Sequence, residues 1–507
     1  MRSKKALKNV VSSLMLQVVS VVCGFIVPRM IIGTYGSAVN GMMTSATQFL
    51  SYIYLLESGA GGVIRAALYK PLSAGNILGV SAIVKASERF FRTVAAVFAL
   101  YALVLACAFP LLVNGDFEWL YTFGMVLIIG ASTFVQYYFG LSNQILIHAD
   151  QKNYVTSTLQ IVTVILNAVI AVVMIRSGAS VHAVKLASSL IFALRPLTLH
   201  FYVRKKYSLP KDVTPDKEAI SQRFDGLGHH IAFFLHTNTD VVILTVFAKL
   251  SHAATVAEVS VYGVYYAVVS GVQKLTSTLS SGIEATFGDM LAKNETEALK
   301  RNFSLYEFVT FTAAAVVFTC TGILIVPFIS VYTRSITDIN YIRPLFAYML
   351  TLSEAVFCIR IPYNSVTLAA GHYRQTRNGA MAEAGINIAL SAALVAPFGL
   401  TGVAVGTLAA MSFRTVQYVF YLSKNILHRS VMTFFVRLGV NCLFSVLSIF
   451  LSTLIPDFAN NYLTWALYAV IILGVCAFVI VPANILFYRD DFRNLLAMAK
   501  RVWRVKS

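Results

Sequence analysis

Roughly fourteen long apolar stretches follow one another from Val10 to Phe487, separated by short polar loops. A hydrocarbon core about 30 Å thick needs ~20 apolar residues per helical crossing, and only helices or closed barrels satisfy their backbone polar groups there. A hydrophobic content of 58%, against ~45–50% for soluble domains, agrees. The sequence therefore predicts an all-α, polytopic membrane protein. We place the crossings at 10–32, 38–62, 91–113, 119–147, 154–175, 180–203, 229–248, 259–288, 305–332, 342–370, 379–398, 401–422, 431–455 and 462–487.

The positive charges fall on alternate sides of these crossings. With the N-terminus inside, 29 of the 40 Lys and Arg residues lie in loops on the cytoplasmic side, whereas Arg176, Lys249 and Arg334 lie on the other side. Cytoplasmic loops accumulate Lys and Arg, so the net charge of +18 indicates orientation rather than nucleic-acid binding. We expect both termini to be cytoplasmic and the number of crossings to be even.

The loops and an internal repeat predict the domain organisation. Residues at offsets of 219 to 222 match between the halves, including Asn167 with Asn387 and Arg195 with Arg414. Six crossings separate each pair, which indicates a parallel repeat about an axis along the membrane normal. We predict an N-terminal lobe of six helices (1–203), a cytoplasmic linker (204–228), a C-terminal lobe of six helices (229–424), and two further helices with a basic cytoplasmic tail (425–507).

Charged residues inside the crossings are the main evidence on chemistry. A Lys or Arg at the centre of a crossing costs about 2.5–3.5 kcal/mol, so such residues usually face a water-filled cavity or a partner. Near helix ends they can instead extend to the interface, which we expect of Lys185, Arg343 and Arg437. Asp240 is expected either to pair with Lys274 or to bind a proton. The predicted substrate-binding cations are Arg29, Arg195, Lys274, Arg360 and Arg414, and the predicted ion- or proton-coupling acids are Glu57, Asp240 and Glu354, with Glu383 a further intramembrane acid.

Several classes of function lack their sequence motifs. The chain has no G-x-x-x-x-G-K-[ST] phosphate loop, no H-E-x-x-H and no cysteine–histidine metal pattern. The six cysteines lie in apolar stretches without paired spacing and are expected to be packing residues. The predicted outer loops are too short to carry the catalytic carboxylates of a glycan polymerase. We therefore expect no enzyme activity, no cofactor and no metal site.

The sequence resembles the Wzx-like oligosaccharide flippases, or polysaccharide transporters, of the multidrug/oligosaccharidyl-lipid/polysaccharide (MOP) exporter superfamily. The resemblance extends over nearly the whole chain. It rests on Tyr35-Gly36 to Asn40-Gly41, Tyr54 to Gly59, Ala67 to Leu72, Asn238-Thr239-Asp240, Val261-Tyr262, Phe287-Gly288-Asp289, Ala370-Gly371-His372, and Glu383 to Val395 leading to Gly402 to Thr407.

This resemblance implies a function and a location. It implies alternating access by two six-helix lobes, which would move an undecaprenyl-pyrophosphate-linked oligosaccharide from the inner to the outer leaflet of the bacterial cytoplasmic membrane. The product would be a surface polysaccharide. It also implies that the first and eighth helices place cations in the cavity, and Arg29 and Lys274 are the matching positions.

The deep charges favour an anionic cargo independently of the resemblance. Arginine binds phosphate strongly in a low dielectric, and outward movement of a cargo with about two negative charges gains roughly 4–5 kcal/mol per 100 mV. H⁺ or Na⁺ coupling is then optional. The alternatives are a MATE-like cation or drug antiporter, which would need a mainly acidic cavity, a membrane enzyme of glycan polymerisation, and a non-transporting scaffold associated with glycan-synthesis proteins.

Overall fold

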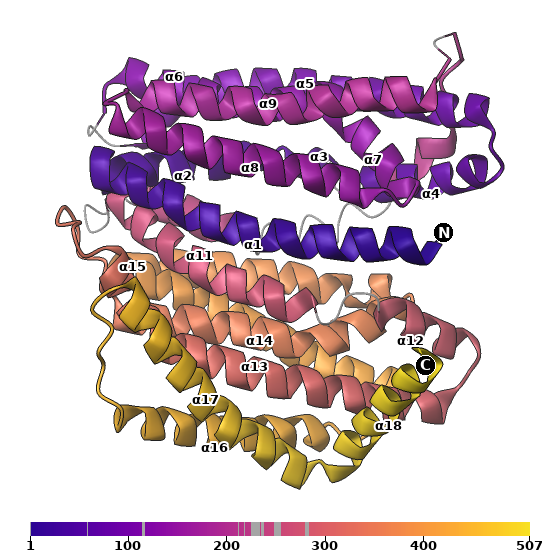
Figure 1. The fold of residues 1–507 in the computed structure, drawn as a ribbon, viewed down its shortest axis with the longest axis vertical. Helices are drawn as coiled ribbons and strands as arrows, with labels where there is room; N and C mark the ends of the chain where they lie inside the picture. The colour runs from indigo at the N-terminus through magenta and orange to yellow at the C-terminus, as the bar shows by residue number, and fades with distance from the viewer. Residues whose placement is uncertain are drawn as a thin grey trace. The chain divides into compact units, whose positions relative to one another are not determined.

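The protein is helical throughout the part that its computed structural model describes, namely residues 2–57, 59–113, 117–210, 212–216, 218–224, 234, 238–247, 255–278 and 283–506 (Figure 1). No strand occurs within these ranges. The first half contains α1 (Arg2–Tyr35), α2 (Ser37–Ser51), α3 (Tyr54–Glu57), α4 (Ala60–Ser73), α5 (Ile77–Leu112), α6 (Trp119–Val135), the π-helix η1 (Gln136–Gly140), α7 (Leu141–Ala149), α8 (Asn153–Arg176), α9 (Val181–Tyr207), the 3₁₀ helix η2 (Glu218–Phe224) and a short helix, Asn238–Phe247. The second half contains α11 (Val256–Thr278), α12 (Ile283–Ala292), α13 (Thr296–Tyr332), α14 (Pro344–Ala369), α15 (Tyr373–Leu422), the π-helix η3 (Ser423–Leu427), α16 (Met432–Thr453), α17 (Tyr462–Phe487) and α18 (Arg489–Lys506).

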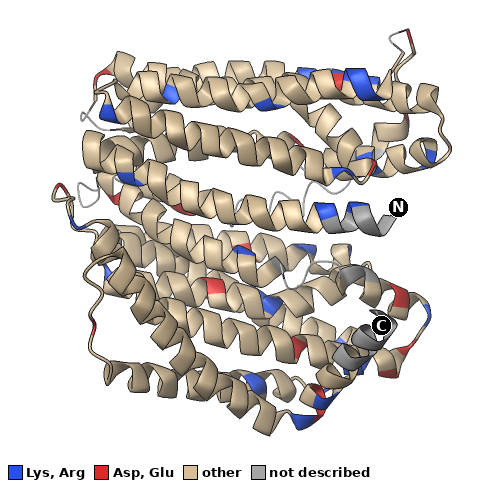
Figure 2. Cartoon of the chain, viewed as in Figure 1, with Lys and Arg blue, Asp and Glu red and all other residues tan. Residues whose placement is uncertain are grey.

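The composition of these helices makes the chain a multi-pass membrane protein. Within the described residues, 10 helices are long and apolar enough to cross a membrane. Large apolar side chains point outward, and Phe478 is 81% exposed, which suits a surface in contact with lipid. Charged residues are sparse along the long helices and more frequent near their ends (Figure 2). The helical fold class is therefore confirmed, whereas the predicted count of fourteen crossings is not established.

One of the predicted crossings is a broken helix. The crossing predicted at 38–62 consists of α2, α3 and the beginning of α4, and Gly59 precedes α4 with a φ of 103°. The crossing predicted at 259–288 contains α11 and the beginning of α12, and residues 279–282 between them lie outside the described residues. A positive φ is readily adopted only by glycine, so the break before α4 is encoded locally. Part of the predicted linker and of the crossing at 229–248 lies outside the described residues.

The helix α15 contains two of the predicted crossings and reverses direction between them. At 50 residues it would be about 75 Å long if straight, which exceeds the membrane thickness. Gly399 instead has a φ of 55° and a ψ of −132°. Asn387 then donates a hydrogen bond to Thr407 across the two arms at 2.9 Å. The predicted crossings at 379–398 and 401–422 are therefore the antiparallel arms of one hairpin.

The turns support the predicted parallel repeat. Left-handed backbone conformations are uncommon, and residues other than glycine adopt them at a cost. In this chain most residues with positive φ have a counterpart in the other half, 219 to 221 residues away. In the described part of the chain, Gly36 and Gly59 have positive φ but no such counterpart. The matching residues with positive φ are Gly75 with Asn294, Gln151 with Gly371, Gly178 with Gly399, and Ser208 with His428.

Contacts divide the chain into two compact units, residues 1–261 and 262–507. Each unit has its own apolar core. In the first unit, α1 packs against α8, and α5, α6 and α9 pack on one another. In the second unit, α13 packs against α14 and α17, and α14 packs against α15. This division is based on contacts between residues, and the lobe boundaries given by the sequence stay a prediction.

A buried ionic cluster connects the last helices to the rest of the second unit. Arg429 donates two hydrogen bonds to Glu307 on α13, both at 2.9 Å. Arg437 on α16 lies 3.4 Å from Glu307 and 2.7 Å from Asp491 at the start of α18. Arg437 is only 3% exposed, so its guanidinium is enclosed by protein, and its extension to the membrane interface stays a prediction. The guanidinium is held inside the protein because Asp491 and the Ser304 carbonyl accept its hydrogen bonds and Glu307 forms an ion pair with it.

Candidate binding pocket

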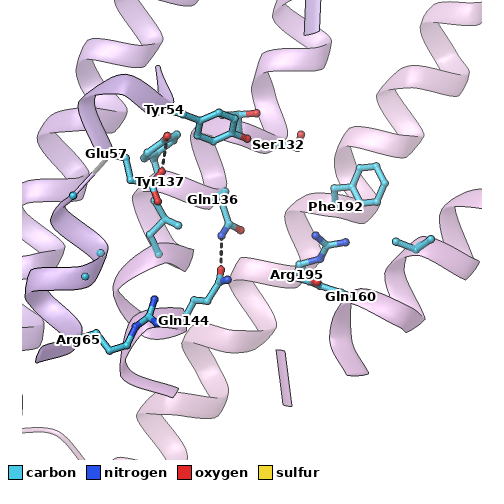
Figure 3. A pocket seen from close by; sticks show the side chains of 16 residues that line it. Tyr54, Glu57, Arg65, Ser132, Gln136, Tyr137, Gln144, Gln160, Phe192 and Arg195 are labelled. Carbon is cyan, nitrogen blue, oxygen red and sulfur yellow. Dashed lines mark hydrogen bonds between the residues drawn. The ribbon is translucent and has the colours of Figure 1, made fainter. Parts of the chain in front are cut away.

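A polar cavity lies inside the first unit, within its bundle of helices. Its volume is about 790 Å³. The lining combines basic, amide, hydroxyl and aromatic side chains from α3, α4, α6 to α9 and η1 (Figure 3). A cavity of this size with a few convergent polar groups is typical of a small-molecule site. It is lined by Tyr54, Glu57, Gly59, Gly61, Gly62, Arg65, Ser132, Thr133, Gln136, Tyr137, Leu141, Gln144, Gln160, Val164, Phe192 and Arg195.

Arg195 on α9 is the best-positioned cation of this pocket. It donates hydrogen bonds from Nε and Nη2 to the hydroxyl oxygen of Thr163 on α8, at 3.2 and 2.8 Å. Its guanidinium lies 5.4 Å from the centre of the Phe192 ring. No carboxylate in the described part of the chain forms an ion pair with it. A half-buried guanidinium held by a neutral hydroxyl keeps donors available for an anion.

The carboxylate in the pocket, Glu57, already accepts a hydrogen bond from the protein. The hydroxyl of Tyr137 donates a hydrogen bond to Glu57 at 2.8 Å. Gln136 donates to Gln144 at 3.1 Å, so these amides form a second polar pair (Figure 3). Two arginines, Arg65 and Arg195, and one carboxylate give the lining a formal charge of +1. The pocket therefore favours an anionic or polyhydroxylated ligand over a cationic one.

In the second unit, two of the predicted cations meet on one carboxylate. Arg360 on α14 donates a hydrogen bond to Glu383 on α15 at 2.5 Å, and Nε of Arg414 lies 3.6 Å from the other carboxylate oxygen. Arg414 also donates to the hydroxyl of Tyr418 at 2.8 Å and to the carbonyl of Thr376 at 2.9 Å. All three charged groups are less than 10% exposed. In this conformation the triad is internal and saturated with protein partners.

Four other predicted residues lie outside the lining of the polar pocket. Arg29 is half-buried on α1, and Lys274 is exposed on α11. Asp240 is buried in the short helix Asn238–Phe247, and Glu354 is buried on α14. None of these four lines the polar pocket. Their roles in substrate binding or ion coupling remain predictions.

A second cavity, of about 650 Å³, lies between α13, α14, α16 and α17. Its lining is mainly apolar, and Phe311, Phe318 and Leu352 contribute to it. Such a surface suits a hydrocarbon chain rather than a sugar. The two cavities belong to different units.

A charged turn closes the end of the first unit where α7 meets α8. Asp150 accepts a hydrogen bond from the hydroxyl of Tyr207 at 2.6 Å and contacts Lys152, and Lys5 lies 3.7 Å away. Burial alone would raise the pKa of Asp150. The hydrogen bonds from Lys152 and Tyr207 outweigh that effect and lower its pKa below the ordinary 3.8. The carboxylate therefore stays charged and holds together the start of α1, the α7–α8 turn and the end of α9.

The sequence interpretation missed several residues of the polar pocket. Arg65 follows the crossing predicted at 38–62 and was not among the predicted binding residues, but it lies on α4 and lines the pocket. Gln136, Gln144 and Gln160 were not singled out. Three amides inside apolar crossings were a usable signal, because an unpaired amide in a hydrocarbon environment is costly.

The fold of this chain is similar to those of several solved structures. The chain is similar to the lipid II flippase MurJ in its inward closed conformation, with a TM-score of 0.69 and 12% identity, covering 95% of this chain and 99% of that chain. It is also similar to an inward-facing multidrug resistance MATE family transporter of the MOP superfamily (TM-score 0.61, 12% identity, 78% and 92% covered). The Vibrio cholerae MATE transporter VcmN in its bent form is similar as well (TM-score 0.54, 16% identity, 83% and 97% covered). No protein-family model and no curated protein matches the chain.

Proposed function

We propose that this protein is a flippase for an undecaprenyl-pyrophosphate-linked oligosaccharide. It would carry this lipid from the inner to the outer leaflet of the bacterial cytoplasmic membrane by alternating access, for export of a surface polysaccharide. The observation that carries the proposal is a polar pocket with a net positive lining, which contains Arg65 and Arg195, on a fold shared with a lipid II flippase. The apolar cavity of the second unit adds a surface on which part of a lipid chain can rest.

The remaining features of the proposal follow from the charges. Both termini are cytoplasmic in this scheme, and no chemical step is catalysed. The membrane potential drives an anionic cargo outward, worth about 2.3 kcal/mol per charge per 100 mV. Arg29 and Lys274 contribute to binding when the lobes rearrange, whereas Arg360 and Arg414 stay paired with Glu383. Glu57, Asp240 or Glu354 supplies any H⁺ or Na⁺ coupling, and association with glycan-synthesis proteins is compatible with this role.

Reconstituted flipping tests the proposal. Purified protein in liposomes should move a fluorescent undecaprenyl-pyrophosphate oligosaccharide between leaflets. Arg195→Gln should lower the initial rate on the order of tenfold, because a charge-assisted contact to the cargo is lost. Arg176→Gln is the matched control, since this exposed arginine ends the neighbouring helix α8 outside the pocket. No flipping by wild type, or equal rates in all three proteins, would contradict the proposal.

A cation or drug antiporter is the second candidate. It is favoured by the carboxylate of Glu57 in the pocket and by the similarity to MATE transporters. Uptake of a cationic dye driven by a proton or sodium gradient, lost in Glu57→Gln, would select this alternative. The positive lining of the pocket argues against it, because a cationic drug would meet two arginines there.

A further inference from the structure

The two halves of the protein contain equivalent arginines in different surroundings. Arg195 and Arg414 are 219 residues apart, which matches the separation of the turn residues with positive φ. Each arginine contacts the preceding arm of its own helical hairpin. Arg195 contacts Thr163 and Arg414 contacts Glu383, and these two partners are 220 residues apart. The same structural position therefore holds a neutral hydroxyl in the first half and a carboxylate in the second.

A third equivalent position strengthens the contrast. Arg360 also binds Glu383, and the residue 220 positions earlier is Gly140. A side chain at Gly140 would meet Pro196, since a Cβ built there lies 2.7 Å from the Cβ of Pro196. The first half thus lacks both the carboxylate and the second guanidinium that fill the site in the second half. In the first half, Arg195 instead lines the polar pocket of about 790 Å³.

The difference decides which arginine can bind a ligand. In the second unit Glu383 accepts a hydrogen bond from Arg360 and lies 3.6 Å from Nε of Arg414, and Arg414 is 2% exposed. An external anion would have to displace a buried carboxylate there, which is costly. In the first unit Thr163 leaves the charge of Arg195 uncompensated by any described carboxylate. The hydroxyl also fixes the guanidinium, because both of its hydrogen bonds come from one edge of the group.

The rest of the lining specifies the ligand class. The amides of Gln136, Gln144 and Gln160 and the hydroxyl of Tyr54 can donate and accept hydrogen bonds, as a sugar ring requires. Phe192 offers an aromatic face beside Arg195 (Figure 3). Such a mixture is suited to a saccharide with one anionic substituent.

We propose that this pocket is a saccharide subsite selective for an acidic sugar, with Arg195 as the contact to its carboxylate or phosphate group. Thr163 determines this selectivity because its neutrality leaves Arg195 free of an internal counter-ion. In the second half, Glu383 occupies the equivalent position and pairs with Arg414 and Arg360. This inference rests on the proposed function in that it assigns the glycan of the flipped lipid a negative charge.

Binding of two soluble tetrasaccharides to the purified full-length protein tests the assignment. The probes are a glucuronate-containing tetrasaccharide and the neutral cellotetraose, each titrated calorimetrically. Wild type should bind the acidic probe at least about tenfold more tightly, since one charge-assisted pair is gained. Thr163→Glu reproduces the carboxylate of the second half and should abolish this preference. Thr163→Gln is similar in size but neutral, and should retain it.

The outcomes separate the inference from the proposed function. If Thr163→Glu binds the acidic probe as tightly as wild type, or if wild type shows no preference, the acidic-sugar subsite is overturned. Thermal unfolding of each variant in the same detergent shows whether a loss of binding reflects misfolding, and Thr163→Gln controls for size. Flipping of a neutral lipid-linked glycan by wild type would uphold the proposed function even when the subsite assignment fails.

Discussion

Replacing Glu383 with glutamine should destabilise the second unit strongly. Glu383 holds Arg360 and Arg414 through contacts of 2.5 and 3.6 Å, and it connects α14 to both arms of the α15 hairpin. The substitution keeps the shape of the side chain but removes its charge. Two buried guanidiniums then face an amide, and its nitrogen cannot accept their hydrogen bonds.

The expected loss follows from the burial of the triad. Removing one partner of a buried ionic cluster typically costs 3–5 kcal/mol. Because Arg414 keeps hydrogen bonds to Tyr418 and to the Thr376 carbonyl, we expect the lower end, about 3 kcal/mol. At roughly 2 °C per kcal/mol for a large unit, the apparent melting temperature should fall by about 6 °C.

Thermal unfolding in detergent provides the measurement. Glu297→Gln is the matched control, because that carboxylate is 89% exposed in a surface pair with Lys300, and its melting temperature should not change. Adding Arg360→Met to Glu383→Gln should recover part of the loss, since it removes one uncompensated charge. Wild-type stability in Glu383→Gln, or a further loss in the double variant, would refute the assignment of the triad as a structural ion cluster.

Three further changes test other parts of the structure. Gly402→Ala should prevent closure of the α15 hairpin, because a Cβ there would lie 2.1 Å from the Leu394 carbonyl oxygen; a normal yield of folded protein on size-exclusion chromatography would contradict this. Asp150→Asn should be less stable than wild type near neutral pH. Because the pKa of Asp150 is lower in the folded state, the difference in stability between the two proteins should disappear as the pH falls below about 4. A difference in stability that does not change with pH would be evidence against the ionic role. Cys320 on α13 and Cys476 on α17 are free and lie in one buried apolar cluster, so copper-phenanthroline should form a disulfide between them. After cleavage at a protease site inserted between residues 333 and 342, the fragments should stay joined without reductant and separate in Cys476→Ala. Separation of the wild-type fragments would contradict the proximity of the two thiols.

The fold class and part of the site were predictable because they depend on local properties. Hydropathy over about 20 residues locates crossings, and the repeat predicted Arg195 and Arg414 as equivalent before their contacts were known. The sequence also pointed to Arg360, Arg414 and Glu383 as deep charges. It did not predict that the three bind one another, since the residues that meet are separated by 23 and 31 positions across a hairpin.

The amino-acid sequence by itself therefore determined the membrane crossings, their helical structure and the internal repeat. Short segments are enough for this, because each contains its own apolar stretch and the residues of its left-handed turns. Only the tertiary structure decided which charges are available. In the sequence, both Arg195 and Arg414 appear as an arginine within an apolar helix. In the structure, Arg195 is half-buried, lines a pocket and contacts the neutral Thr163. Arg414 is instead buried against the carboxylate of Glu383. The physical reason is that the cost of a charge in a membrane is set by the groups around it, and folding brings those groups from distant positions in the chain.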